Sequence, residues 1–120
     1  MRTIDSLVDA PWGQHGVLEE GPGFKAKVLI VAPRQRLSLQ KHARRSEHWV
    51  VAEGTAEATA GGTVLLIGTG GTLYVPVSTT HRIANPSYFH RLVVFEVQLG
   101  ACEENDIVRI EDDYGRVPSQ

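Results

Sequence analysis

The sequence predicts an all-β protein, and three observations support this fold class. Short strand-like segments recur along the chain and are separated by turns rich in glycine and proline. No long stretch shows the apolar period of an amphipathic helix. A set of polar residues with the spacing of metal ligands requires distant strands to meet around an interior. That requirement favours a jelly-roll β-barrel over an open sandwich.

The expected strands follow one another at near-regular spacing, and a turn signal ends most of them. They cover residues 17–20, 24–32, 36–42, 47–53, 56–60, 63–67, 73–75, 81–84 and 92–99. Glycine and proline separate the first two strands at 21–23, and Pro33 introduces the connection to the third. Glycines at 54, 61–62 and 68–71 separate the next strands. Residues 107–110 also resemble a strand, so we expect the C-terminal segment to remain docked until about Arg116.

Length and charge limit the classes of function. The 120 residues suit a single domain, which we expect to span 1–120 with a core from about 10 to 116. A net charge of −2 gives no broad attraction for nucleic acid or an anionic membrane. Neither a signal-peptide pattern nor a membrane-length apolar run is present, so we expect a cytoplasmic protein. Cys102 is the only cysteine, which excludes an intrachain disulfide and a cysteine-based metal cluster.

Four polar residues form the most informative pattern of the chain. Gln40 and His42 are two positions apart, so on a strand they lie on the same side, and Glu47 and His81 can join them from neighbouring strands. Two imidazoles, one carboxylate and one neutral amide oxygen are donors that suit a divalent first-row metal ion. We therefore predict one metal site, with zinc as the expected ion and manganese, cobalt, nickel and iron as alternatives.

The residues around this pattern resemble a known family. Gln40-x-His42-x4-Glu47-x6-Gly54, followed by Gly70-x5-Pro76-x4-His81-x3-Asn85, is similar to the paired motifs of the cupin superfamily. Segments 36–40, 45–51 and 54–56, with Pro11-Trp12-Gly13 before them and 106–109 and 111–116 after them, resemble the cupin domain of type II mannose-6-phosphate isomerases. The resemblance implies a single-domain cupin that isomerises a sugar phosphate, without the nucleotidyltransferase part that commonly accompanies it.

The implied reaction interconverts mannose 6-phosphate and fructose 6-phosphate, and it needs a phosphate anchor besides the metal. Arginine is the expected anchor because its planar fork can donate two parallel hydrogen bonds to phosphate. Arg36 shares a strand face with Gln40 and His42, so we expect its side chain to point into the cavity. The candidate substrate-binding residues are Arg36, Arg116, Arg44 and Arg45.

The reaction also needs a base, for which the sequence offers three candidates. Glu96 and Gln98 alternate with apolar residues, so the two polar side chains share one face of a strand. If that face points inward, burial raises the pKa of Glu96 toward the range that suits proton transfer. If it points outward, Glu96 is solvent-facing. Lys27, on the neighbouring strand, and Asp113, in the C-terminal segment, are the other candidates.

One departure from the family pattern keeps other functions open. The family usually has a histidine-rich run where this chain has His42-Ala43-Arg44. The loss of the later histidines is compatible with a non-catalytic, metal-containing cupin that binds a sugar or sugar phosphate. A cupin dioxygenase with iron in the same kind of site is a third hypothesis. In each phosphate-binding case the partner is a small-molecule sugar phosphate, and we expect a homodimer because open sheet edges invite another strand.

Overall fold

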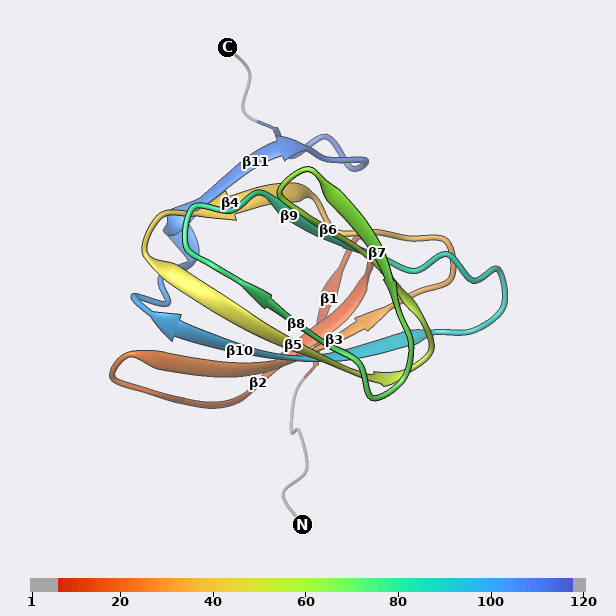
Figure 1. The fold of residues 1–120 in the computed structure, drawn as a ribbon, viewed down its shortest axis with the longest axis horizontal. Helices are drawn as coiled ribbons and strands as arrows, with labels where there is room; N and C mark the ends of the chain where they lie inside the picture. Colours follow the sequence, from red (N-terminus) through yellow and green to blue (C-terminus); the bar gives the residue numbers. More distant parts are fainter. Residues whose placement is uncertain (1–6, 118–120) are drawn as a thin grey trace.

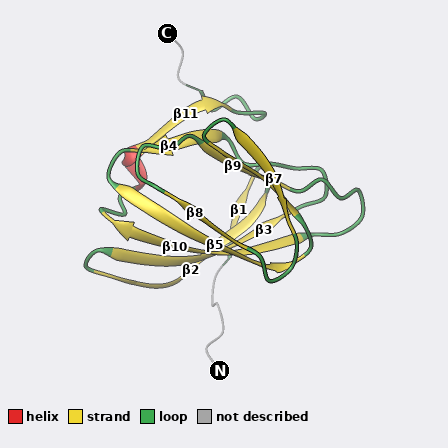
Figure 2. Ribbon diagram, viewed as in Figure 1, coloured by secondary structure: helices red, strands yellow, loops and turns green. Residues whose placement is uncertain are grey.

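The computed structural model describes residues 7–117 as two antiparallel sheets that face each other across a shared interior (Figure 1). The larger sheet contains, in spatial order, Val8–Ala10 (β1), Gly13–Gly21 (β2), Phe24–Val31 (β3), Leu92–Gly100 (β10), Arg45–Glu53 (β5) and Thr72–Val75 (β8). The smaller sheet contains Ile107–Glu111 (β11), Leu39–His42 (β4), His81–Ala84 (β9), Ala56–Ala60 (β6) and Thr63–Ile67 (β7). The only helix in this part of the chain is the single turn Glu104–Asp106, as Figure 2 shows. The all-β prediction is confirmed.

Tight turns fix the register of neighbouring strands. β2 and β3 pair from Gly21 and Phe24 outward, so Pro22 and Gly23 alone form the turn, and Gly23 takes a left-handed φ of 83°. A pair of glycines forms a turn of the same length between β6 and β7. Because a slip of one residue would turn every side chain to the other face, these turns also determine which residues of paired strands share a face.

The interior changes from apolar to polar along single strands. On β10, Val94 points inward, and the next two inward positions hold Glu96 and Gln98, all at most 5% exposed. On the neighbouring strand β5, Val51 lies opposite Val94, whereas Glu47 lies opposite Gln98. One end of the barrel is therefore an apolar core, and the other end is lined by polar side chains.

The apolar core depends on tightly enclosed aliphatic side chains, of which Leu92 has no exposed surface. Leu92→Ala should lower the free energy of unfolding by about 2–5 kcal/mol, because it removes buried surface and leaves a cavity. Leu66→Ala is the matched control, since Leu66 is 72% exposed on β7 and its loss should change stability by less than about 0.5 kcal/mol. Urea unfolding of both variants measures the difference, and similar losses would contradict the assigned core.

Most expected strands are present near their predicted bounds, and two regions differ. The strand expected at 17–20 belongs to the longer β2, and the short edge strand β1 was not predicted. The strand expected at 36–42 begins only at Leu39. Before it, Arg34 adopts a left-handed φ of 63° and Arg36 forms an isolated bridge to Ala84. This irregular backbone interrupts the alternation on which the predicted direction of the Arg36 side chain relied.

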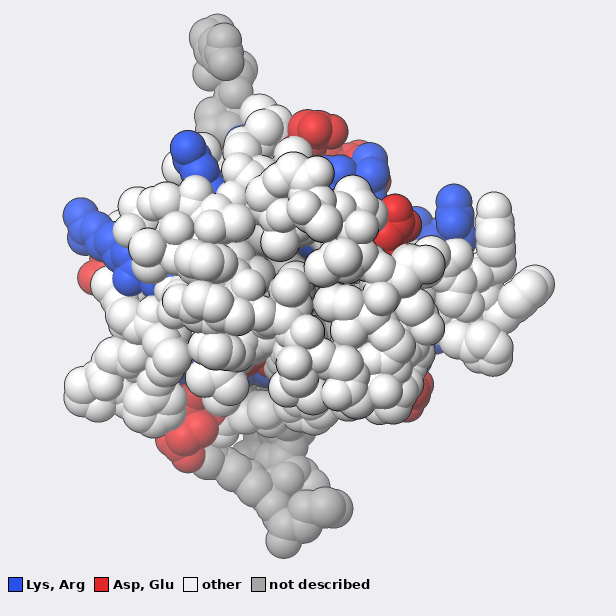
Figure 3. Space-filling model, viewed as in Figure 1, with Lys and Arg blue, Asp and Glu red and all other residues white. Residues whose placement is uncertain are grey.

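Charged side chains of both signs lie on the face that Figure 3 draws. Figure 3 shows lysine and arginine side chains interspersed with aspartate and glutamate around the rim of one face, and no broad region of a single sign lies on that face. Within residues 7–117, no helix has the length and apolar character needed to cross a membrane.

Candidate metal centre

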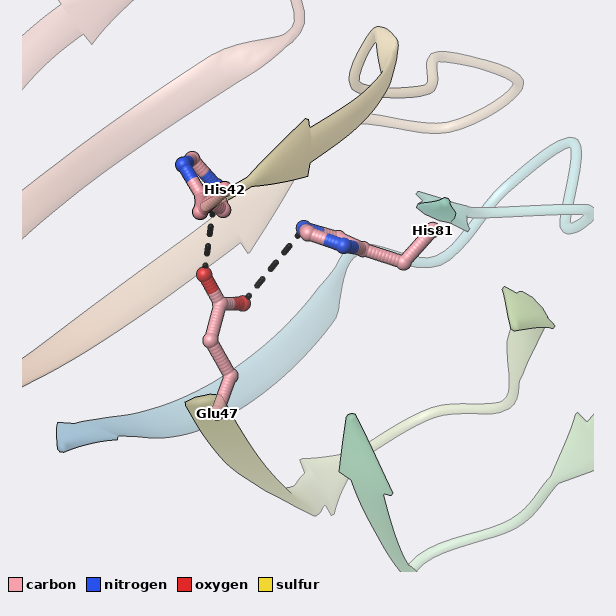
Figure 4. Close-up of side chains that lie close together, drawn as sticks. All are labelled: His42, Glu47 and His81. Atoms are coloured by element: carbon pink, nitrogen blue, oxygen red, sulfur yellow. Dashed lines mark ion pairs between the residues drawn. The ribbon is translucent and has the colours of Figure 1, made fainter. Parts of the chain in front are cut away.

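Three of the predicted ligands lie together at the polar end of the interior (Figure 4). His42 ends β4 and His81 begins β9 in the smaller sheet, whereas Glu47 lies on β5 of the larger sheet. Glu47 Oε2 lies 3.3 Å from His42 Nε2, and Glu47 Oε1 lies 3.6 Å from His81 Nε2. One potential ligand atom from each residue lies within 4.8 Å of the other two, and all three residues are buried. One ion can therefore contact all three.

Hydrogen bonds show which nitrogen of each imidazole carries the proton. His81 Nδ1 lies 3.0 Å from the carbonyl oxygen of Thr79, which can only accept, so Nδ1 carries the hydrogen and Nε2 keeps its lone pair. His42 Nε2 lies 3.0 Å from Arg45 Nη2, which can only donate, and this shorter contact favours an unprotonated Nε2 over one that donates to Glu47 Oε2 at 3.3 Å. In both histidines the nitrogen that faces Glu47 is the one with the lone pair.

Burial keeps both imidazoles neutral. Desolvation, helped by the charge of Arg45, lowers the pKa of His42 to about 4. Desolvation also lowers the pKa of His81. Near neutral pH, two neutral imidazoles therefore face the two oxygens of one carboxyl group. A divalent cation fits this donor set, because neutral imidazole and carboxylate are ordinary ligands of zinc and its neighbours in the first row.

Two further side chains of β5 orient Glu47. Arg45 Nε donates to Glu47 Oε2 at 3.1 Å, and Trp49 Nε1 donates to Glu47 Oε1 at 2.9 Å. The three residues are two positions apart on one strand, so all three side chains point inward. These hydrogen bonds hold the carboxyl group toward the imidazoles, as outer hydrogen bonds do around bound metals.

Gln40, the fourth predicted ligand, lies beside this cluster. It stands opposite His81 in the register of β4 and β9, it is 9% exposed, and it lines a cavity beside the cluster. Its Nε2 lies 3.5 Å from the carbonyl oxygen of Ser38. Gln40 thus occupies a position from which an amide oxygen can add a donor, and the ligand role of all four residues stays a prediction.

A cavity of about 130 Å³ opens next to the cluster. This volume is roughly ten times the space that one water molecule needs, so a polar ligand of several heavy atoms fits. Apolar walls are supplied by Trp12, Leu29, Leu37, Trp49 and Ile83. The remaining lining is mostly charged or amide-bearing, which makes this a site for a polar ligand.

Glu96 and Lys27, two of the candidate bases, both line this cavity and stand opposite each other on β10 and β3. Glu96 Oε1 accepts a hydrogen bond of 2.8 Å from Gln98 Nε2. Burial, together with the nearby charge of Glu47, raises the pKa of Glu96 to about 7. The inward alternative for Glu96 is therefore the one that the fold adopts.

Asp113, the third candidate base, and Arg36 do not line the cavity. They pair with each other on the outside, with Arg36 Nε 2.7 Å from Asp113 Oδ2 and side chains that are 43% and 42% exposed. The expected inward direction of Arg36 is wrong because its segment is not a regular strand. Arg44 is also exposed and away from the cavity, and its backbone N–H donates to Asp106 Oδ2 at 2.9 Å.

Among residues 7–117, the arginines that line the cavity are Arg45, Arg109 and Arg116. Arg45 and Arg116 were predicted as candidates, whereas Arg109 was missed. Arg109 lies opposite Gln40 in the register of β11 and β4. The sequence alternates apolar and polar residues here, a pattern that usually places the apolar ones inside. In this fold the apolar neighbours Val108 and Ile110 are 53% and 44% exposed, and Arg109 faces inward.

Asp112 anchors the segment that carries Arg116. Hydrogen bonds from Arg116 hold the pKa of Asp112 at about 2, below the usual value for an aspartate. A lowered folded-state pKa stabilises the fold above the unfolded-state pKa, and this contribution is lost as the pH falls through the folded-state value. Asp112→Asn should therefore lower the free energy of unfolding by about 1–3 kcal/mol at neutral pH and by progressively less below about pH 4.

Asp113→Asn is the matched control for this prediction, because its pair with Arg36 is exposed. Exposed ion pairs contribute little, so the loss should stay below about 1 kcal/mol. Urea unfolding across the acidic range measures both variants. Equal losses at neutral pH, or a loss in Asp112→Asn that persists in strong acid, would contradict the assigned role of Asp112.

Comparisons with known proteins show the family of this chain. The family model described as "Mannose-6-phosphate isomerase C-terminal" matches residues 2–112. Xanthan biosynthesis protein XanB of Xanthomonas campestris pv. campestris (strain B100) is 46% identical over 107 residues, which cover 88% of this chain and 23% of that protein. Mannose-1-phosphate guanylyltransferase ManC of Salmonella typhimurium is 43% identical over 108 residues, which cover 89% of this chain and 22% of that protein. The chain thus spans less than a quarter of the length of these relatives.

Solved structures share the fold at low sequence identity. An RmlC-like cupin from Shewanella frigidimarina matches with a TM-score of 0.75 at 17% identity, over 83% of this chain and 87% of that one. KdgF from Halomonas sp. matches with a TM-score of 0.74 at 17% identity, over 84% and 91%. The predicted cupin fold is confirmed. On the strength of the family match, this chain belongs to the family of mannose-6-phosphate isomerase C-terminal domains.

Proposed function

We propose that this chain binds one divalent metal ion through His42, Glu47 and His81, with Gln40 as a further donor, and interconverts mannose 6-phosphate and fructose 6-phosphate. The observation that carries the proposal is the buried cluster of three ligands beside a polar cavity that also contains Glu96. Family membership supports the choice of a sugar phosphate as substrate. Zinc is the proposed ion, because two imidazoles and a carboxylate form a common ligand set of catalytic zinc.

The proposed isomerisation moves a proton between neighbouring carbons. A base removes the proton from C2 of the open-chain aldose while the C1 oxygen gains a proton, which gives the enediol. Return of a proton to C1, while the C2 hydroxyl loses its own, gives the ketose. When bound, a divalent ion supplies a Lewis acid that polarises the sugar carbonyl.

Glu96 is the proposed base because of where its carboxyl group lies. It lines the cavity together with Glu47 and His81, and the hydrogen bond from Gln98 orients it. Lys27 stands opposite Glu96 in the strand register and is the second candidate for proton transfer. Trp12 and Trp49 cover the apolar side of the cavity, where they exclude water from the reacting carbons.

Arg116 and Arg109 are proposed to bind the phosphate group. Both line the cavity, and the Arg116 side chain is 29% exposed, so it marks the side that is open to solvent. A phosphate held there leaves the other end of an open-chain sugar directed toward Glu96 and the cluster. The planar guanidinium of arginine suits the recognition of phosphate oxygens.

A non-catalytic sugar-phosphate-binding protein is the second candidate, and one observation favours it. The guanidinium groups of Arg45 and Arg116 already contact the carboxyl groups of Glu47 and Asp112. Fewer donors are then available to fix a phosphate and place its sugar for proton transfer. In this case the metal and the sugar phosphate bind, but no isomerisation follows.

Conversion of ¹³C-labelled mannose 6-phosphate distinguishes the two candidates. Protein stripped of metal is reconstituted separately with zinc, manganese, cobalt, nickel or ferrous iron, and the labelled sugar is followed by NMR. The isomerase proposal predicts metal-dependent formation of fructose 6-phosphate. Metal-replete protein that binds mannose 6-phosphate and forms no ketose would refute the isomerase and support the binding protein.

A further inference from the structure

Arg45 contacts the same atoms that the proposed metal centre uses. Its Nη2 lies 3.0 Å from His42 Nε2 and 3.1 Å from Glu47 Oε2, and its Nε donates to that same oxygen at 3.1 Å. Arg45 is only 6% exposed, so water does not compete for these contacts. The guanidinium therefore bridges two of the three ligands.

His42 Nε2 can serve one partner at a time. A neutral imidazole has a single unprotonated nitrogen, and arginine has donors only. The lone pair that accepts a hydrogen from Arg45 is thus the lone pair that a metal ion needs. At this atom, the hydrogen bond from Arg45 and a bond to a metal exclude each other.

Charge acts in the same direction. The guanidinium of Arg45 is a cation. Two cations that share the carboxyl group of Glu47 repel each other, and burial makes this repulsion stronger than it would be in water. A bound metal ion and the present position of Arg45 are therefore incompatible in charge as well as in lone pairs.

Arg45 also has an unused donor near the cavity. It lines the cavity, and within residues 7–117 its buried Nη1 has no hydrogen-bond partner. A buried charged donor without a partner is costly, and an oxyanion offers the strongest hydrogen bonds to a guanidinium. An anionic group in the cavity is thus the natural partner for Arg45 when its bond to His42 is broken.

We propose that Arg45 is a latch between the metal site and an anion site. Arg45 releases His42 when a divalent ion binds, and its guanidinium then binds an oxyanion, such as a phosphate group, in the cavity. The two ligands are therefore coupled, and each raises the affinity for the other by the same factor. This inference rests on the metal centre of the proposed function and is independent of isomerase activity.

The zinc affinity of Arg45→Gln tests the competition. It is measured against a chromophoric chelator in buffer without phosphate, with Arg44→Gln as the matched control because Arg44 is the exposed neighbour outside the cavity. Arg45→Gln should bind zinc at least about tenfold more tightly than wild type, because neither the hydrogen bond nor the charge opposes the ion. Arg44→Gln should stay within about twofold of wild type.

Calorimetric titration with inorganic phosphate tests the coupling. Wild-type protein should bind phosphate at least about fivefold more tightly with zinc than without it, and Arg45→Gln should lose most of that gain. A gain of equal size in the variant would mean that phosphate responds to zinc without Arg45, which would overturn the anion half of the latch.

Three results would overturn the competition, and they separate the latch from the metal centre. Equal or weaker zinc binding by Arg45→Gln, with normal binding by wild type, would make Arg45 a residue that only orients Glu47. Failure of wild type to bind zinc would remove the metal centre as well.

If Arg45→Gln does not fold, ¹⁵N spectra of wild-type arginine side chains give the readout. The Nε–H signal of Arg45 should shift with zinc, while that of Arg91 should not. An unchanged Arg45 signal would overturn the latch.

Discussion

Glu47→Gln is expected to abolish zinc binding, so that the zinc-to-protein ratio falls below about one tenth. The substitution preserves the size of the side chain but removes the negative charge that faces His42 Nε2 at 3.3 Å and His81 Nε2 at 3.6 Å. The new amide oxygen can still accept from Arg45, and the amide nitrogen can donate to His81 Nε2 in place of the bond from Trp49, so the variant should fold with reduced stability. If the chain is the proposed isomerase, its kcat should fall at least about 100-fold together with the metal.

Elemental analysis after gel filtration measures the zinc content, and thermal unfolding shows whether the variant is folded. Glu53→Gln is the matched control, because Glu53 lies on the same strand but is 52% exposed and pairs with Arg91. It should keep the wild-type zinc content. His42→Ala and His81→Ala should lose zinc as Glu47→Gln does. A folded Glu47→Gln protein with full zinc content would contradict the ligand assignment.

Glu96→Gln is expected to lower kcat by about 10²–10⁴-fold, the usual contribution of a positioned acid or base. Zinc content and affinity for mannose 6-phosphate should stay near the wild-type values, because the substitution preserves shape. The amide can still hydrogen-bond to Gln98 but cannot take a proton from C2. A selective loss of kcat would therefore identify Glu96 as the base and exclude the non-catalytic candidate.

Lys27→Gln, measured beside Glu96→Gln, decides between the two cavity residues. If Lys27 transfers the proton, its substitution lowers kcat more than that of Glu96. The Glu53→Gln protein serves again as the control for the loss of a carboxyl group. A Glu96→Gln enzyme that retains kcat within about tenfold of wild type would rule out Glu96 as the base.

The fold class and the ligand cluster could be predicted without a structure. Turn residues such as Gly23 mark where strands end, and the two-residue period of a strand places Gln40 and His42 on the same face. The motif spacing then indicates that Glu47 and His81 join them. The strand ends and the shared face depend on local backbone geometry and residue type, whereas the meeting of the two sheets is indicated only by the spacing of the motifs.

Other parts of the site could not be predicted in this way. Alternation shows that Glu96 and Gln98 share a face, but the two faces of β10 are equivalent until the smaller sheet packs against one of them. The same holds for Arg109 on β11. For Arg36, a left-handed residue and an isolated bridge interrupt the strand, so a regular period misplaces the side chain.

The contacts of Arg45 with Glu47 and His42 show most clearly which features the sequence predicts and which only the fold decides. Arg45 and Glu47 are two positions apart in the sequence, which predicts that their side chains share one face of β5. The hydrogen bond from Arg45 to His42 depends on the approach of β4 from the other sheet. Local spacing determines which side chains share one face of a strand, whereas the packing of two sheets determines which face is enclosed and which distant residues meet there.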